Sequence, residues 1–106
     1  PGQGASTELS AGDIEMNLLK RTVSRQGNQV NLSAREFDLL AFLMRHPGQV
    51  LSKEQLLNGV WGYDYDPGTN IVGVYIAYLR RKLTIEGSPD PIETLRSVGY
   101  RLVEGK

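Results

Sequence analysis

NIVGVYIAYLRRKL, residues 70–83, combines the hydrophobic period of an α-helix with a cationic end. At 100° per residue, one narrow sector collects the apolar side chains of Val72, Ile76, Leu79 and Leu83 and predicts a buried face. The opposite sector is chemically mixed and contains Asn70, Val74, Ala77, Tyr78 and Arg81. Amide, methyl, phenol and guanidinium groups can all meet a DNA groove. The pattern therefore favours a DNA-reading helix, although the helix dipole alone also explains cations at 80–82.

The whole chain limits the classes of protein that remain. Its 106 residues are enough for one domain that folds without metal or disulfides, and it contains no cysteine, which is compatible with the cytoplasm. No apolar run approaches the ~20 residues of a membrane span, and no signal peptide is recognisable, so we expect a soluble protein without membrane contact. Formal net charge is zero, but residues 70–106 carry six cations against four anions, so any basic surface is local.

The first third of the chain predicts a small sheet. Residues 1–11 are rich in Gly, Ser and other small residues and are interpreted as a linker or chain end, which leaves 12–106 as the folded domain. Residues 13–32 alternate apolar and polar side chains around Gly27 and Asn28. This alternation predicts two or three short antiparallel strands.

Two helices should precede the basic helix. Ser33 and Glu36 have the spacing of a capping box, and the following apolar residues predict a helix to about Arg45, with Phe37, Leu39, Leu40, Ala41, Leu43 and Met44 facing the core. Ser52 and Gln55 repeat that spacing before a short helix that ends at Gly62 and buries Leu56, Leu57, Val60 and Trp61. Thr69 is expected to cap the third helix, which should run from 70 to about 85.

The end of the chain predicts a β-hairpin. Residues 92–95 and 100–103 have strand composition, and 96–99 form the turn between them. Helix, short helix, loop, basic helix and hairpin in this order predict an α+β fold, a winged helix-turn-helix with an N-terminal antiparallel sheet. In this architecture the third helix enters the major groove and the hairpin, or wing, reaches the backbone or the minor groove.

Three blocks of sequence resemble one family closely. LSAREFDLLAFLMRHPGQVLSKEQLLNGVWG, IVGVYIAYLRRKL and IETLRSVGYRL occur in the order found in the winged-helix effector domains of OmpR/PhoB-type response regulators. The resemblance spans about residues 9–104. It implies a transcription regulator of a two-component phosphorelay, cut from a longer chain whose receiver domain is phosphorylated by a cognate sensor kinase. It also implies binding to repeated half-sites at promoters, as a dimer on DNA.

The resemblance implies roles for individual residues. It assigns base contacts to Val74, Ala77, Tyr78 and Arg81, and backbone contacts to Trp61, Asn70, Ile71, Tyr75, Arg80, Thr94 and Tyr100. Arg96, at the hairpin turn, is expected to enter a narrow A·T-rich minor groove. Alternatives remain at several positions: a core role for Val74, Tyr78 and Trp61, a semi-buried packing role for Tyr75, and a solvated turn for Arg96.

The segment 62–69 corresponds to a loop that touches RNA polymerase in some family members. Tyr63, Asp64, Tyr65 and Asp66 suit such a contact, and a polar connector is the alternative. Two departures from the family pattern matter. Gly73 stands where an Asp is frequent, and Ala77 and Tyr78 stand where some members have arginines, so the operator cannot be transferred from those members.

Enzymatic readings have little support. The only histidine, His46, precedes Pro47 at a predicted helix end, and Asp64 with Asp66 has no third ligand or catalytic partner nearby. We therefore predict no catalysis, no metal and no cofactor. Two other classes remain as alternatives: first a winged-helix protein-interaction module that does not bind DNA, and more distantly a small-molecule sensor.

Overall fold

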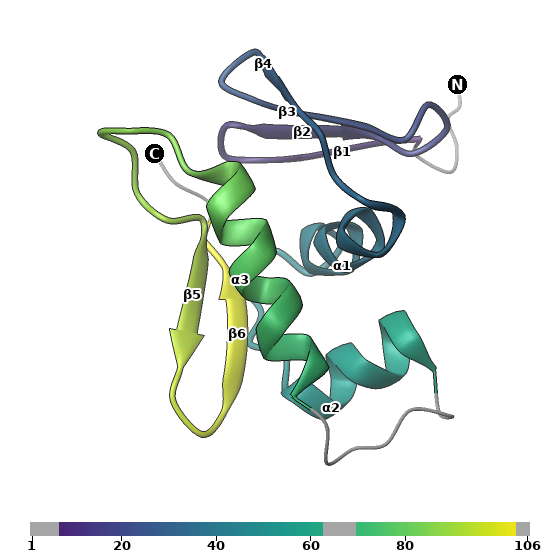
Figure 1. The fold of residues 1–106 in the computed structure, drawn as a ribbon, viewed down its shortest axis with the longest axis vertical. Coiled ribbons are helices and arrows are strands. Elements are labelled where there is room, and N and C mark those ends of the chain that lie inside the picture. The colour runs from purple at the N-terminus through teal and green to yellow at the C-terminus, as the bar shows by residue number, and fades with distance from the viewer. Residues whose placement is uncertain (1–6, 63–69, 104–106) are drawn as a thin grey trace.

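The computed structural model describes residues 7–62 and 70–103 of the chain (Figure 1). An antiparallel sheet of four strands comes first, three helical segments follow, and a two-stranded hairpin ends the domain. The α+β winged-helix architecture that the sequence predicts is therefore confirmed. The elements are β1 (Glu8–Ala11), β2 (Ile14–Asn17), β3 (Thr22–Arg25), β4 (Asn28–Val30), α1 (Ala34–Met44), α2 (Lys53–Leu56), the π-helical turn η1 (Leu57–Trp61), α3 (Ile71–Leu83), β5 (Ile92–Leu95) and β6 (Gly99–Leu102).

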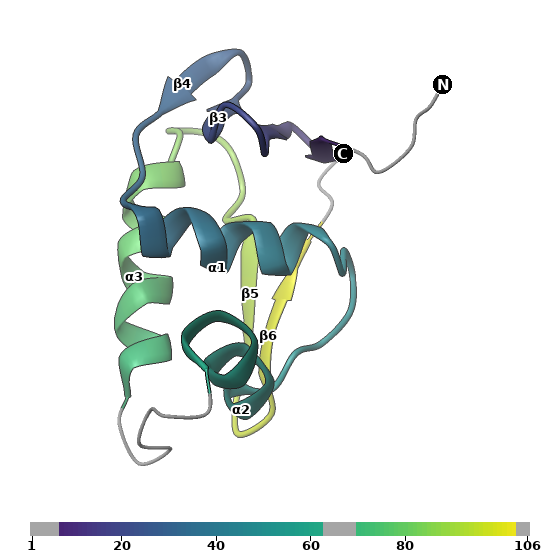
Figure 2. The same cartoon turned by 90° about the vertical axis from the view of Figure 1, so that its right-hand side faces the viewer.

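The N-terminal sheet is larger than the sequence predicts. It has four strands in the order β1-β2-β3-β4 rather than two or three. Residues Glu8–Ala11, which we interpreted as part of a linker, form β1 and pair with β2 in the register Leu9↔Met16. Composition missed this strand because its sequence, ELSA, contains no β-branched or aromatic residue and carries little strand signal, and β2 supplies its hydrogen-bond partners. One face of the sheet is buried, and the sheet lies across α1 and the end of α3 (Figures 1 and 2).

Both predicted capping boxes are present. Ser33 Oγ accepts from the Glu36 N–H at 3.3 Å, and Glu36 Oε1 accepts from the Ser33 N–H at 2.9 Å. The Ser52 and Gln55 pair repeats the arrangement at 3.0 and 2.8 Å. These side chains satisfy N–H groups that a helix start leaves open, and so they fix where α1 and α2 begin.

The second helix differs from the prediction. After one α-helical turn it widens into η1, in which Val60 is only partly buried, and it ends at Gly62, whose φ is 97°. Phe42 of α1 lies directly over the backbone of Gly59, where a Cβ atom would be 2.2 Å from the phenyl ring. This close approach belongs to tertiary packing, so hydrophobic spacing along the segment could not predict the wider turn.

The core lies between α1, α3 and the hairpin, under the sheet. Its fully buried large side chains are Ile14, Leu39, Leu40, Leu43, Leu51, Leu56, Ile76, Leu79, Leu83, Ile92 and Leu102. Across residues 7–62 and 70–103, no helix combines the length and apolarity needed to cross a bilayer.

Candidate nucleic-acid interface

Helix α3 exposes the side that the sequence assigns to DNA. Its buried residues are the predicted stripe of Val72, Ile76, Leu79 and Leu83. Opposite them, Val74 is 41% exposed and Tyr78 is 37% exposed, and Ala77 and Arg81 are exposed as well. These values exclude the alternative in which Val74 and Tyr78 pack in the core.

The start of α3 is sparsely stabilised. The N-cap is Asn70 rather than Thr69, which lies outside the described residues, and the Asn70 side chain makes no capping hydrogen bond. That amide instead lies over Gly73, where a Cβ atom would be 2.7 Å from Asn70 Oδ1. The first turn also contains no acidic residue. Gly73 therefore gives room to the Asn70 side chain at the end of α3 where contact with the DNA backbone is predicted.

A row of aromatic rings supports the exposed side of α3. The Tyr75 ring lies edge-on between Trp61, 5.2 Å away, and Tyr78, 5.3 Å away. Trp61 is 8% exposed and belongs to the core, while Tyr75 is partly buried. Arg35 covers the Trp61 ring and Arg81 covers the Tyr78 ring, at 5.5 and 5.9 Å. The row restricts the Tyr78 side chain and ends in a guanidinium on each side.

The three cations at the end of α3 have different surroundings. Lys82 Nζ donates to the buried carboxylate of Glu36 at 2.7 Å. Arg80 donates through Nη2 to the Ile92 carbonyl and to Thr94 Oγ1, and its Nε lies 3.0 Å from Asp90 Oδ2 in an ion pair. Among the described residues, Arg81 alone of the three has no carboxylate partner. Only its charge remains uncompensated at the exposed side of α3.

Glu36 links the start of α1, where it completes the capping box, to Lys82 in the last turn of α3. Burial disfavours its ionised form, but hydrogen bonds from Lys82 and from the Ser33 N–H outweigh that cost and lower the pKa of the Glu36 carboxyl. The ionised pair therefore holds the last turn of α3 against α1 at neutral pH.

The wing presents Arg96 at its turn. Strands β5 and β6 pair in the register Leu95↔Gly99, and the Val98 N–H donates to the Leu95 carbonyl at 2.9 Å. Arg96 is exposed and makes no hydrogen bond or ion pair with residues 7–62 or 70–103. Val98 beside it is 55% exposed. The turn thus presents one guanidinium and one apolar side chain to the outside.

The other wing residues that were predicted to contact DNA are less accessible than Arg96. Tyr100 is 7% exposed, and its backbone N–H and carbonyl pair with Leu51, so the core holds it. Thr94 is exposed but its hydroxyl accepts from Arg80. Gly99 lies so close to Leu51 that a Cβ atom would be 2.0 Å from the Leu51 carbonyl oxygen. This contact sets β6 against the residues that lead into α2.

Two further cations that we did not predict lie at the starts of α1 and α2. Arg35 lies in the first turn of α1, where its Nη1 donates to the Val60 carbonyl, and the exposed Lys53 is the first residue of α2. Neither has a carboxylate partner among the described residues. A cation in the first turn of a helix is unfavourable because it opposes the macrodipole. This unfavourable placement was the sequence feature that could have identified Arg35 and Lys53 as candidate site residues.

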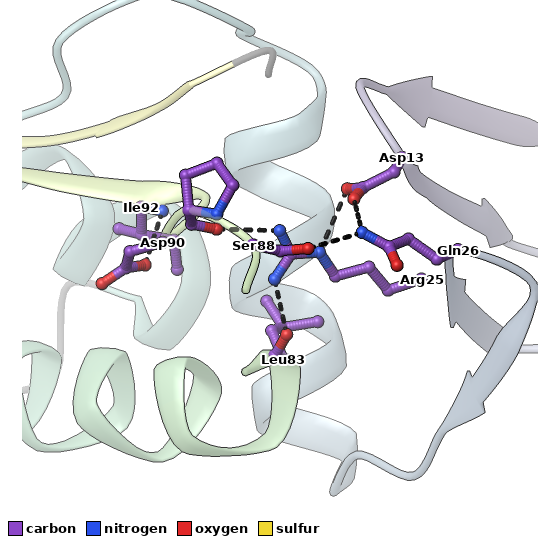
Figure 3. A network of polar contacts seen from close by, with 8 residues as sticks. Asp13, Arg25, Gln26, Leu83, Ser88, Asp90 and Ile92 are labelled. Carbon is purple, nitrogen blue, oxygen red and sulfur yellow. Dashed lines mark hydrogen bonds and ion pairs between the residues drawn. The ribbon is translucent and has the colours of Figure 1, made fainter. Parts of the chain in front are cut away.

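A buried arginine anchors α3 to the N-terminal sheet (Figure 3). Arg25 of β3 is 3% exposed and donates to Leu83 O at 2.6 Å and to Pro89 O at 2.8 Å. Its Nε donates to Asp13 Oδ1 at 3.1 Å, and Gln26 links Asp13 to Ser88. The hydrogen bond from Gln26 and the charge of Arg25 lower the pKa of Asp13, against a desolvation cost. The network joins the sheet, the last carbonyl of α3 and the loop before β5.

Residues 27–102 match the family described as "Transcriptional regulatory protein, C terminal". The chain belongs to this family. The resemblance of its motifs to OmpR/PhoB-type effector domains is thereby confirmed. The predicted polymerase-contacting residues Tyr63, Asp64, Tyr65 and Asp66 lie outside the described part of this effector domain.

Similar proteins include complete regulators and isolated domains. The uncharacterized transcriptional regulatory protein YkoG of Bacillus subtilis is 46% identical over 96 residues, which are 91% of this chain and 42% of that protein. The phosphate regulon transcriptional regulatory protein PhoB of Rhizobium meliloti is 44% identical over 97 residues, 92% of this chain and 43% of that one. This effector domain therefore spans less than half the length of these curated relatives.

A solved structure of a relative contains DNA. The crystal structure of the Klebsiella pneumoniae RstA DNA-binding domain in complex with the RstA box has a TM-score of 0.82 to this chain. The two are 33% identical, and the match covers 94% of this chain and 100% of that one. The DNA-binding domain of CpxR from E. coli is 34% identical with a TM-score of 0.80, covering 95% and 100%.

Proposed function

We propose that this domain binds duplex DNA in a sequence-specific manner and controls transcription as the effector part of a two-component response regulator. One observation carries the proposal. The exposed side of α3 and the turn of the wing each present a guanidinium without a carboxylate partner in the described structure, Arg81 and Arg96. The wing lies alongside α3 (Figure 1), so a duplex can meet both.

The proposed mode of binding places α3 in the major groove. Val74 offers a methyl surface for thymine, the Tyr78 hydroxyl reaches a base edge or a phosphate, and Arg81 offers two donors to a guanine. Arg96 occupies the adjacent minor groove. The backbone is contacted from the start of α3 and from around it, by Asn70, Ile71, Trp61, Tyr75, Arg35 and Lys53.

A salt titration tests the proposal. Duplex affinity of the unmodified domain should fall steeply with salt, and each lost phosphate contact should lower the slope of log K against log salt by about 0.9. Arg81→Ala should cost about 1 to 3 kcal/mol and relax the preference at one base pair. Arg96→Ala should relax the preference for A·T pairs on the wing side.

Arg45→Ala is the matched control. Arg45 is exposed and ends α1 at the side of the domain away from α3 (Figure 2), so its loss should leave both slope and preference unchanged. Binding that is indifferent to salt and to both substitutions in α3 and the wing would favour a winged-helix module that binds protein instead.

The partners of the full-length protein follow from the same proposal. A receiver domain elsewhere in the full-length protein, phosphorylated by a sensor kinase, would regulate binding in the cytoplasm, and two copies would occupy repeated half-sites because one module has a small interface. Residues 63–66 would contact RNA polymerase. Tyr63→Ala with Tyr65→Ala should then abolish activation while DNA binding persists, and retained activation would exclude that contact.

A further inference from the structure

Arg80 contacts three alternate residues at and just before the start of the wing. These are Asp90, in the loop before β5, and Ile92 and Thr94, which belong to β5. Arg80 contacts the carboxylate of the first, the carbonyl of the second and the hydroxyl of the third. Asp90 is itself fixed, because its Oδ1 accepts from the Ile92 N–H at 2.9 Å.

These contacts connect two elements that few other polar groups join. Among the described residues, the backbone of the hairpin also bonds to Leu51 through Tyr100 and to Gly48 through Leu102, and neither partner belongs to α3. Thr94 lies two residues before Arg96, so a shift of β5 at Thr94 moves the turn almost directly. Groove contacts need side chains placed to within about 0.5 Å, a tolerance that a free hairpin does not meet.

We infer that Arg80 is a positioning residue that sets the wing against α3, so that Arg96 enters the minor groove while α3 occupies the major groove. The inference rests on the proposed function and revises the phosphate-contacting role that the sequence predicts for Arg80. Electrostatics support it. The Asp90 carboxylate compensates the Arg80 charge, and Arg80 Nη2 donates to both Ile92 and Thr94 of β5. Arg81, the next residue, has neither constraint.

The two roles predict opposite effects of Asp90→Asn and Asp90→Ala. For a phosphate ligand, loss of the nearby carboxylate frees Arg80 and removes repulsion from DNA, so binding tightens. For a positioning residue, the wing loses its attachment, and discrimination between A·T and G·C pairs on the wing side falls at least about fivefold. Asp90→Asn keeps the acceptor for the Ile92 N–H, and Asp90 is exposed, so the variant should fold.

Glu93→Gln is the matched control for these variants. Glu93 is the exposed neighbour on β5, and its carboxylate pairs with Arg101 rather than with Arg80. Its loss removes the same charge three residues further along the chain. Wing-side discrimination should therefore stay unchanged in this variant.

The decisive experiment measures duplex binding across salt concentrations, with A·T or G·C pairs on the wing side. Arg80→Lys and Arg80→Ala should both lose wing-side discrimination with an unchanged salt slope. In a domain that already carries Arg96→Ala, neither substitution should reduce wing-side discrimination further. Tighter binding by Asp90→Asn than by Glu93→Gln with wing-side discrimination retained, or near-normal binding by Arg80→Lys with a slope reduced by about 0.9 in Arg80→Ala, would overturn the inference. Failure of the unmodified domain to bind duplex DNA at all would instead overturn the proposed function.

Discussion

The two ends of α3 are held in very different ways. At the C-terminal end, the last carbonyl accepts from Arg25, the Thr84 hydroxyl donates to the Arg80 carbonyl at 2.6 Å, and Lys82 pairs with Glu36. At the N-terminal end, Asn70 provides no side-chain cap, and a glycine occupies the first turn. One helix thus combines a fixed end with a weakly stabilised one.

The difference between the two ends of α3 would favour DNA binding in the proposed function. A C-terminus fixed to the sheet and to α1 sets the direction of the helix axis before DNA arrives, which limits the entropy lost on binding. The start of α3 leaves its N–H groups without a side-chain acceptor from the N-cap. That end can adjust to the groove and to the backbone beside it.

The largest expected effect is at the fixed end. Arg25→Ala leaves the Leu83 and Pro89 carbonyls without their side-chain donor and Asp13 without its ion pair, and we expect the domain to lose about 3 kcal/mol of unfolding free energy in urea denaturation. Arg21→Ala is the control, because Arg21 pairs with Asp38 at the surface and should cost less than about 1 kcal/mol. Equal losses of unfolding free energy in the two variants would show that the Arg25 network stabilises the domain no more than a surface ion pair does.

A smaller effect is expected from Glu36→Gln, and it depends on pH. Because the folded state lowers the Glu36 pKa, this carboxyl stabilises the domain fully above its ordinary pKa of about 4.3, and the contribution is lost as pH falls through the lower folded value. The variant should lose about 1 to 2 kcal/mol at pH 7 and show a shallower decline in acid. Asp13, whose pKa is also lowered, should preserve part of that decline. Parallel acid profiles for the two proteins would contradict the assignment.

The smallest effect is expected at the weakly held end. The nearest atoms to a Cβ atom at Gly73 belong to the amide of the exposed Asn70 side chain. Because that side chain makes no capping hydrogen bond, it can move away. Gly73→Ala should therefore stabilise the domain by about 0.5 to 1 kcal/mol, through the lower entropy of the unfolded chain and better helix propensity. Thermal unfolding measures the gain, and destabilisation would show that Asn70 is already fixed where it lies.

Local patterns predicted a large part of this domain. Both capping boxes and the buried stripe of α3 depend on spacings of two to four residues, and they occur where the sequence places them. The hairpin was also predicted, and its second strand begins one residue earlier, at Gly99. Strand β1 and the π-helical turn were missed, because a paired neighbour and the approach of Phe42 create them.

The amino-acid order alone determined the starts of α1 and α2 and which side of α3 faces outward, since side-chain period and caps act within a few residues of the chain. Tertiary structure alone decided which cations remain available to DNA. Lys82 finds its carboxylate 46 positions away, and Arg25 reaches a carbonyl 58 positions away. Only folding brings such groups within hydrogen-bond distance, and so only the fold separates an arginine that holds the wing from the adjacent one that can meet a base.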